Sequence, residues 1–137
     1  MKKGYGACDH IGILTNNVKR LERFYVDKLG FKKEKQEVLP RAISKAVFGI
    51  DCDCDFIRLE YASVKIELFR PKKSRLKRNQ GHAGNHHWGF AVLDREAFCR
   101  KLKAKKTKLI EVKRNSHVVY FAQDPDGNRI EIRDIIR

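Results

Sequence analysis

The sequence has no long apolar run. None of the apolar stretches in its 137 residues approaches the roughly 20 residues that a membrane-spanning helix needs, so we expect no transmembrane segment. The N-terminal stretch MKKGYGACDH begins with a basic pair and lacks the apolar stretch of about 7–15 residues that marks a secretory signal. We therefore expect a cytoplasmic protein that does not associate with membranes.

Cysteine is scarce and is not arranged as a disulfide framework. The chain has four cysteines, and none of them forms a C-x-x-C pair. Because nothing marks secretion, we expect reduced thiols. The run DCDCD at residues 51–55 places Cys52 and Cys54 closer together than the about 2–4 intervening residues usual between paired zinc cysteines. We interpret this run as a polar hairpin or loop.

Acidic residues are few relative to basic ones. The 17 Asp and Glu residues stand against 31 Lys and Arg residues, which gives a net charge of +14. The cations gather in KKEK (32–35), RPKKSRLKR (70–78) and RKLKAKK (100–106). Such charge attracts polyanions without specifying them, but little aromatic surface lies among the runs for stacking bases. A nucleic-acid partner is thus not favoured, and a small anionic substrate remains open.

The composition, 42% hydrophobic and 35% charged, is that of one soluble globular unit. Within it, DHIGIL (9–14) and HHWGFAV (86–92) share the pattern histidine, any residue, glycine, hydrophobic residue. Two domains of ordinary size do not fit in this length. The sequence therefore predicts a duplication inside one domain.

Both halves predict the same order of elements: strand, helix and three strands. In the first half a helix follows Thr15 or Asn16 as N-cap and stops at Gly30. In the second half Asp94 is the expected N-cap. The three further strand candidates of the first half are EVLPRAISKAVFGI (37–50), DFIRLEYA (55–62) and SVKIELF (63–69). Those of the second half are KLIEVKR (108–114), HVVYFAQ (117–123) and, after the turn DPDGN, RIEIRDII (129–136).

Each half places a histidine on its first predicted strand, His10 or His87, and a glutamate on its last, Glu67 or Glu131. Each glutamate points away from its apolar neighbours, because strand side chains alternate. Taken singly, each residue is explained as an ordinary polar group on a half-buried strand. The matching placement instead favours one site, and two imidazoles with two carboxylates suit Zn, Ni, Mn or Fe(II).

Three other histidines compete with this set. His86 adjoins His87, but the H-x-G pattern shared with His10 favours His87. His82 lies in a polar linker and His117 at a strand start, so we expect both to be bystanders.

These stretches resemble the vicinal oxygen chelate superfamily of glyoxalases, bleomycin resistance proteins and dioxygenases. DHIGILTNNVKRLERFYVDKLGF is similar to the opening strand and helix of that family, VKIELF to its mid-chain ligand strand, HHWGFAVLD to its second opening strand and YFAQDPDGNRIEI to its closing hairpin. The resemblance implies an α+β fold in which two tandem βαβββ modules form a cup-shaped mixed sheet. It implies a single domain over 1–137, with module one at about 5–70, a linker at about 71–85 and module two at about 86–137.

By position, the resemblance implies that the metal ligands are His10, Glu67, His87 and Glu131. The order His, Glu, His, Glu is that of bacterial glyoxalase I (lactoylglutathione lyase). It implies a metal-dependent lyase or isomerase that shifts a proton beside a carbonyl through a metal-stabilised enediolate, for example on a glutathione-type hemithioacetal, with Glu131 and Glu67 as catalytic bases. The implied cofactor is divalent Ni or Zn, with Mn, Co or Fe as alternatives and glutathione or another thiol as cosubstrate.

Other members of the superfamily supply the alternatives. The alternative functions are those of an epimerase similar to the methylmalonyl-CoA enzymes, a thiol transferase, a dioxygenase, or a resistance protein that binds a ligand without catalysis. Arg41, Arg58 and Arg129 are candidate contacts for an anionic small molecule. Family members are commonly homodimers, so we expect a homodimer.

Overall fold

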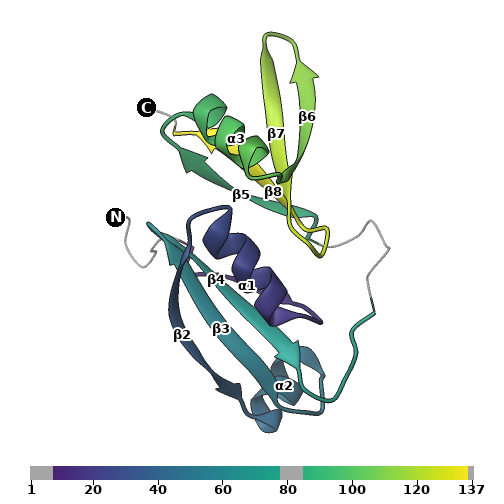
Figure 1. Ribbon diagram of the computed structural model, residues 1–137. Coiled ribbons are helices and arrows are strands. Elements are labelled where there is room, and N and C mark those ends of the chain that lie inside the picture. The colour runs from purple at the N-terminus through teal and green to yellow at the C-terminus, as the bar shows by residue number, and fades with distance from the viewer. Residues whose placement is uncertain (1–7, 78–84, 136–137) are drawn as a thin grey trace, which may run out of the picture. The chain divides into compact units, whose positions relative to one another are not determined.

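The computed structural model describes residues 8–77 and 85–135 and divides the chain into two compact units, Met1–Arg78 and Asn79–Arg137. Each unit contains one helix-covered sheet (Figure 1). We refer to them as unit 1 and unit 2. No helix of the described ranges is long and apolar enough to cross a membrane.

Unit 1 contains a four-stranded sheet in the order β1-β4-β3-β2. β1 runs parallel to β4, and the other two pairs are antiparallel, so the sheet is mixed. Its elements are β1 (Ile11–Leu14), α1 (Val18–Asp27), β2 (Lys32–Leu39), α2 (Arg41–Phe48), β3 (Cys54–Tyr61) and β4 (Val64–Pro71).

Unit 2 repeats this plan with the order β5-β8-β7-β6. β5 runs parallel to β8, and the other two pairs are antiparallel. Its elements are β5 (His87–Val92), α3 (Arg95–Ala104), β6 (Lys108–Arg114), β7 (His117–Gln123) and β8 (Arg129–Asp134). The predicted α+β fold with two βαβββ modules is confirmed.

Helix α1 closes the core of unit 1. It buries Val18, Leu21, Phe24 and Tyr25, which recur every three or four residues and so share one helical face. Against it lie the fully buried side chains of β3 and β4: Ile57, Leu59, Ile66 and Leu68. Each fully buried side chain of this size contributes about 1.5–3 kcal/mol, so this layer fixes β4 and the glutamate on it.

The N-caps follow the prediction in one unit and depart from it in the other. Asp94 accepts a hydrogen bond from the backbone N–H of Ala97 at 3.0 Å, as predicted. In α1 the cap is Asn17, whose side chain accepts from the backbone N–H of Arg20 at 3.0 Å, so the prediction of Thr15 or Asn16 is wrong. The Asn16 side chain is instead engaged by the backbone of Leu76, at 2.9 and 2.8 Å.

The prediction of a single strand over 37–50 is also wrong. β2 ends at Leu39, and helix α2 follows with Pro40 as its N-cap. Proline has a fixed φ near −65° and no N–H, which suits the start of a helix and interrupts a strand. The helix ends at Gly49, which adopts the left-handed φ of 70° that glycine tolerates.

Of the run DCDCD, expected to be a polar hairpin or loop, residues 51–53 form a loop and residues 54–55 begin β3, but its two cysteines are buried. Cys52 and Cys54 are 4% and 0% exposed, and Cys54 begins β3 with its thiol 3.2 Å from the Ser44 hydroxyl. The two acidic side chains beside them support α2: Asp53 accepts from the backbone N–H of Arg41 at 2.7 Å, and Asp51 pairs with the Arg41 guanidinium. All four cysteines are free thiols.

Candidate metal centre

The same strand register places a glycine beside a glutamate in each unit. Where β1 pairs with β4, Gly12 lies opposite Glu67, and where β5 pairs with β8, Gly89 lies opposite Glu131. A histidine two residues before each glycine lies on the same side of its strand as that glycine. The repeated motif therefore brings a histidine to a glutamate in both units.

In unit 1 the pair is His10 and Glu67. Nε2 of His10 lies 3.3 Å from Oε1 of Glu67. Glu67 is only 7% exposed, although an isolated strand glutamate ordinarily faces water. On its other side, His10 Nδ1 lies 2.8 Å from Oδ2 of Asp9.

Arg58 explains how this carboxylate is tolerated in a buried place. Arg58 of β3 lies opposite Glu67 of β4, and its Nε and Nη2 atoms donate to Oε2 at 2.8 and 2.5 Å. These hydrogen bonds raise the pKa of the Arg58 guanidinium. A buried charge needs such a partner. Because both Arg58 donors bind Oε2, the other oxygen, Oε1, faces His10.

In unit 2 the pair is His87 and Glu131, and it is held more loosely. Nε2 of His87 lies 3.9 Å from Oε2 of Glu131, and Nη1 of Arg133 lies 3.9 Å from Oε1. A Cβ on Gly89 would lie 3.1 Å from the Glu131 carbonyl oxygen and 3.2 Å from its Cβ. Glycine at this position thus allows β5 and β8 to approach closely at Glu131.

The His10–Glu67 pair has the donor types and the spacing of two ligands of one divalent metal. Two ligands at about 2.0–2.2 Å from one tetrahedral ion lie roughly 3.3–3.6 Å from each other, and the His10–Glu67 separation of 3.3 Å is in that range. With the proton of neutral His10 directed to Asp9, Nε2 and Oε1 are two acceptors face to face, and only a proton or a metal ion between them satisfies both. The longer 3.9 Å separation in unit 2 needs a small side-chain movement.

Within residues 8–77 and 85–135, no three metal-binding side chains gather at one point. The structure brings His10 together with Glu67 and His87 together with Glu131, one pair in each unit. His117, the expected bystander, is exposed at the start of β7. His82 lies outside the described residues.

The chain matches the Glyoxalase/Bleomycin resistance protein/Dioxygenase superfamily over residues 7–132. It belongs to that superfamily. Enzymes and non-catalytic binding proteins both occur among its members, and divalent metals are often bound. No curated protein matches the chain.

Solved structures of superfamily proteins share its fold. A glyoxalase family protein from Enterococcus faecalis is 22% identical with a TM-score of 0.70, covering 95% of this chain and 98% of that one. A lactoylglutathione lyase from Agrobacterium tumefaciens is 18% identical with a TM-score of 0.65, covering 96% of each chain. The trypanothione-dependent glyoxalase I of Leishmania major is 19% identical with a TM-score of 0.67, covering 92% and 84%. At these identities the likeness shows the fold alone.

Two of the arginines that were candidate anion contacts are engaged within the protein. Arg58 donates to Glu67, and Arg41 to Asp51. Arg129 is exposed at the start of β8. Sequence reasoning missed the Arg58–Glu67 contact because it depends on the register between β3 and β4.

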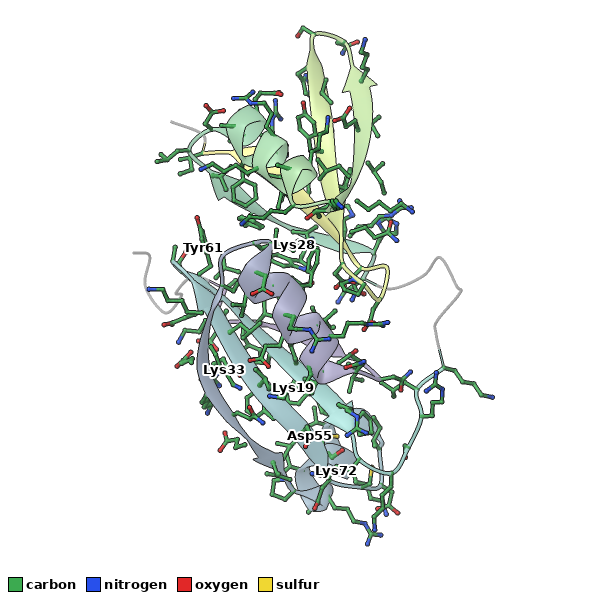
Figure 2. The ribbon with its side chains drawn as sticks, in the orientation of Figure 1. Lys19, Lys28, Lys33, Asp55, Tyr61 and Lys72 are labelled. Atoms are coloured by element: carbon green, nitrogen blue, oxygen red, sulfur yellow. The ribbon has the colours of Figure 1, made fainter. Side chains whose placement is uncertain are left out.

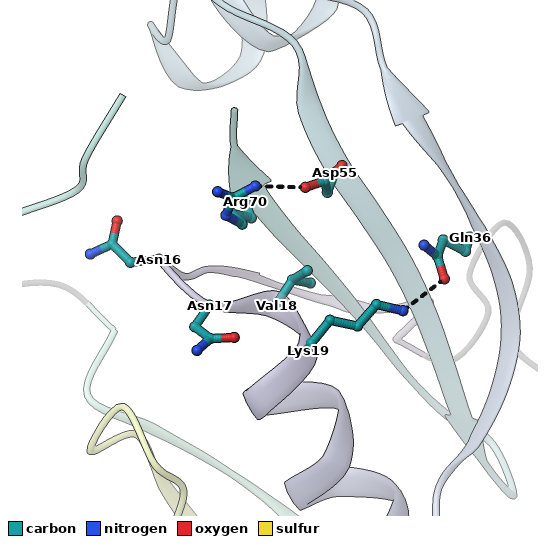
Figure 3. Close-up of a pocket in the computed structure, with 7 residues that line it drawn as sticks. All are labelled: Asn16, Asn17, Val18, Lys19, Gln36, Asp55 and Arg70. Carbon is teal, nitrogen blue, oxygen red and sulfur yellow. Dashed lines mark hydrogen bonds and ion pairs between the residues drawn. The ribbon is translucent and has the colours of Figure 1, made fainter. Parts of the chain in front are cut away.

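A second polar feature of unit 1 lies on the other face of the sheet. A pocket of about 520 Å³ is lined by Asn16, Asn17, Val18, Lys19, Gln36, Asp55 and Arg70 (Figure 3). Its charges are largely matched: Arg70 Nη1 lies 2.9 Å and Lys72 Nζ 3.0 Å from Asp55. Burial raises the pKa of Asp55, but the hydrogen bonds and charges of Lys72 and Arg70 together lower this pKa by more than burial raises it. The net shift of the pKa is therefore downward. Because Asp55 and Arg58 are three residues apart on one strand, the pocket and Glu67 lie on opposite faces.

Proposed function

We propose that the chain is a metal-dependent lyase or isomerase of the glyoxalase type. One divalent ion, Ni or Zn first and Mn, Co or Fe as alternatives, would be held by His10, Glu67, His87 and Glu131. The observation that carries this proposal is the repeated register, which sets a glutamate beside a histidine in both units. Two imidazoles and two carboxylates suit these borderline ions.

A divalent ion in this place would supply Lewis-acid polarisation of a substrate carbonyl. Glu131 then acts as the general base, because within the described residues its carboxylate makes just the two 3.9 Å ionic contacts, with His87 and Arg133, and can reorient. It takes the proton from the carbon beside the carbonyl and returns it to the neighbouring carbon. Such base catalysis contributes about 10²–10⁴-fold. Glu67 would serve the opposite face of a substrate through Oε1, since Arg58 occupies Oε2.

The proposed substrate is a small anion such as the hemithioacetal of glutathione or another thiol. The net charge of +14 favours anionic ligands. Two structural relatives, the lactoylglutathione lyase and the trypanothione-dependent glyoxalase I, have names that point to thiol conjugates, and this suggests the same class for the present chain. We further propose a cytoplasmic homodimer, as is common in the family.

One observation favours a second function. Arg58 already compensates the charge of Glu67 without a metal. A ligand-binding protein that needs no metal and catalyses no reaction is therefore the alternative.

Turnover of hemithioacetals by metal-free and Zn- or Ni-reconstituted protein tests the proposal. Thioester formation should require the metal and fall at least about 100-fold in Glu131→Gln, which keeps the side-chain size and loses the base. Glu111→Gln is the matched control, since Glu111 is an exposed glutamate of unit 2 that pairs with Lys103. Equal rates with and without metal, or an active Glu131→Gln, would reject this mechanism.

A further inference from the structure

The residue directly before each predicted ligand histidine contacts the same ring atom of that histidine. In unit 1, Oδ2 of Asp9 lies 2.8 Å from Nδ1 of His10. In unit 2, Nδ1 of His86 lies 2.9 Å from Nδ1 of His87. The residues at equivalent positions of the two modules thus contact Nδ1 of the following histidine, one with a carboxylate and the other with an imidazole.

The contact with Asp9 determines which nitrogen of His10 can bind a metal. Both carboxylates beside the ring only accept hydrogen bonds, but Asp9 lies 2.8 Å from Nδ1 whereas Glu67 lies 3.3 Å from Nε2, so the one proton of the neutral ring lies on Nδ1. A neutral imidazole carries one ring proton, and Nε2 therefore retains its lone pair. Nε2 is the atom 3.3 Å from Glu67, so Asp9 selects the tautomer whose lone pair faces the carboxylate.

The contact between His86 and His87 allows two arrangements, because one ring donates and the other accepts. If His87 donates through Nδ1, its Nε2 holds a lone pair toward Glu131, 3.9 Å away. If His86 donates, Nε2 of His87 carries the proton and cannot bind a metal. Only the first arrangement is compatible with a metal ligand.

We propose that Asp9 and His86 are positioning residues of the metal site, each accepting a hydrogen bond from Nδ1 of the following histidine and so leaving Nε2 of His10 and of His87 free for the ion. The proposal rests on the proposed function. It changes the role expected for His86, which becomes the module-two counterpart of Asp9. Partners of this kind fix the ring orientation and raise the basicity of the ligand nitrogen.

If Asp9 served only to stabilise the fold, replacing it would lower the unfolding midpoint. The Asp9 and His10 side chains are 80% and 43% exposed, so their contact adds little to folding stability. Replacing Asp9 should therefore leave the unfolding midpoint unchanged. A weaker metal affinity of the Asp9 variant would then reflect a change in the His10 imidazole and not a loss of folding stability.

The first readout is the ring tautomer in the metal-free protein. Long-range ¹H–¹⁵N spectra of the ¹⁵N-histidine-labelled chain, recorded about two pH units above the ordinary imidazole pKa of about 6.5, should show His10 protonated at Nδ1. In Asp9→Ala the proton should shift toward Nε2. His117→Ala is the control, because His117 is an exposed histidine of unit 2 away from both ligand histidines in the sequence, and it should leave the His10 signals in place.

The second readout is zinc affinity by calorimetry. Asp9→Ala and His86→Ala should each weaken zinc binding about 10–100-fold, whereas His117→Ala should bind like wild type. Asp9→Asn and His86→Asn keep a side-chain oxygen that can accept from Nδ1 and should recover part of the loss. Recovery by the asparagine variants separates ring positioning from a loss of charge.

If wild type binds zinc and both alanine variants bind it with the same affinity, this proposal alone is overturned. A His10 tautomer that is unchanged in Asp9→Ala would have the same consequence. A wild-type chain that takes up no zinc would overturn the proposed function together with it. The spectra of the metal-free protein distinguish the two failures, since they report the Asp9–His10 contact without any metal.

Discussion

The two glutamates of the repeated motif have unequal surroundings. Glu67 is 7% exposed and receives two hydrogen bonds from Arg58 on one oxygen. In the part of the chain that the structure describes, the Glu131 carboxylate has ionic contacts of 3.9 Å with His87 and Arg133 and none shorter. A carboxylate held on one oxygen makes a stable one-oxygen ligand, while a loosely held one can move a proton. This difference supports Glu131, ahead of Glu67, as the first of the two proposed bases.

The two motif glycines offer a matched test of this geometry. A Cβ at Gly89 would lie 3.1 Å from the Glu131 carbonyl oxygen, whereas at Gly12 the nearest atom is a ring carbon of Phe69 at 3.8 Å. We expect Gly89→Ala to displace β8 at Glu131 and weaken zinc binding about tenfold, and Gly12→Ala to bind like wild type. Calorimetric zinc titration of the two variants measures this. Equal affinities would show that the β5–β8 spacing does not position Glu131.

The sequence suggests the histidines and glutamates of the proposed site, which stay a prediction, but not the residues that contact them. His10, Glu67, His87 and Glu131 follow from a motif repeated at matching strand positions. Arg58 lies nine residues from Glu67 and meets it only through antiparallel pairing, which no local pattern encodes. The signal for Asp9 and His86 was present, since each directly precedes its histidine, but side-chain alternation along a strand argues against such a contact.

At the scale of elements, the strands beside the site were predictable because apolar residues alternate with polar ones in β4 and β8. The strand β2 was not, because KKEKQEVL is almost entirely charged or polar. It pairs only with β3, at the edge of the sheet, where charged side chains discourage association with other strands. The backbone pairing with β3, and not burial, defines it.

The contact between α3 and β7 gives a test at this scale. The Tyr120 hydroxyl of β7 donates to Glu96 of α3 at 2.6 Å, and this hydrogen bond, with burial, raises the pKa of Tyr120 to about 12. The unfolded tyrosine ionises near pH 10, so the native state binds the proton more tightly. The stabilisation is present below pH 10 and is lost between about pH 10 and 12.

Urea unfolding at pH 9 and pH 11.5 measures this effect. The wild-type free energy of unfolding should fall more between the two pH values than that of Tyr120→Phe, which cannot ionise at this position. Identical pH dependence in the two proteins would mean that the Tyr120–Glu96 hydrogen bond does not couple the helix to the sheet.

At the scale of the whole molecule, the excess of basic residues is carried by exposed side chains, among them the labelled Lys19, Lys33 and Lys72 (Figure 2). Several have acidic neighbours: Lys19 and Lys33 lie 3.4 and 3.2 Å from Glu22, and Lys72 lies 3.0 Å from Asp55. Ion pairs with such solvent-exposed lysines add little stability, so the charge acts chiefly on what approaches the protein. An anionic substrate is consistent with that field.

Our central proposal is that both modules contribute ligands to one metal ion. Elemental analysis of untagged protein purified without chelators tests it directly, with His87→Ala as the variant and His117→Ala as its control. The account predicts about one Ni, Zn, Co or Mn per chain in wild type and in His117→Ala, and loss of that metal in His87→Ala. Iron in that position would favour an oxygenase. A chain that holds none of these ions even after reconstitution, or a His87→Ala variant that keeps the full amount, would contradict the account.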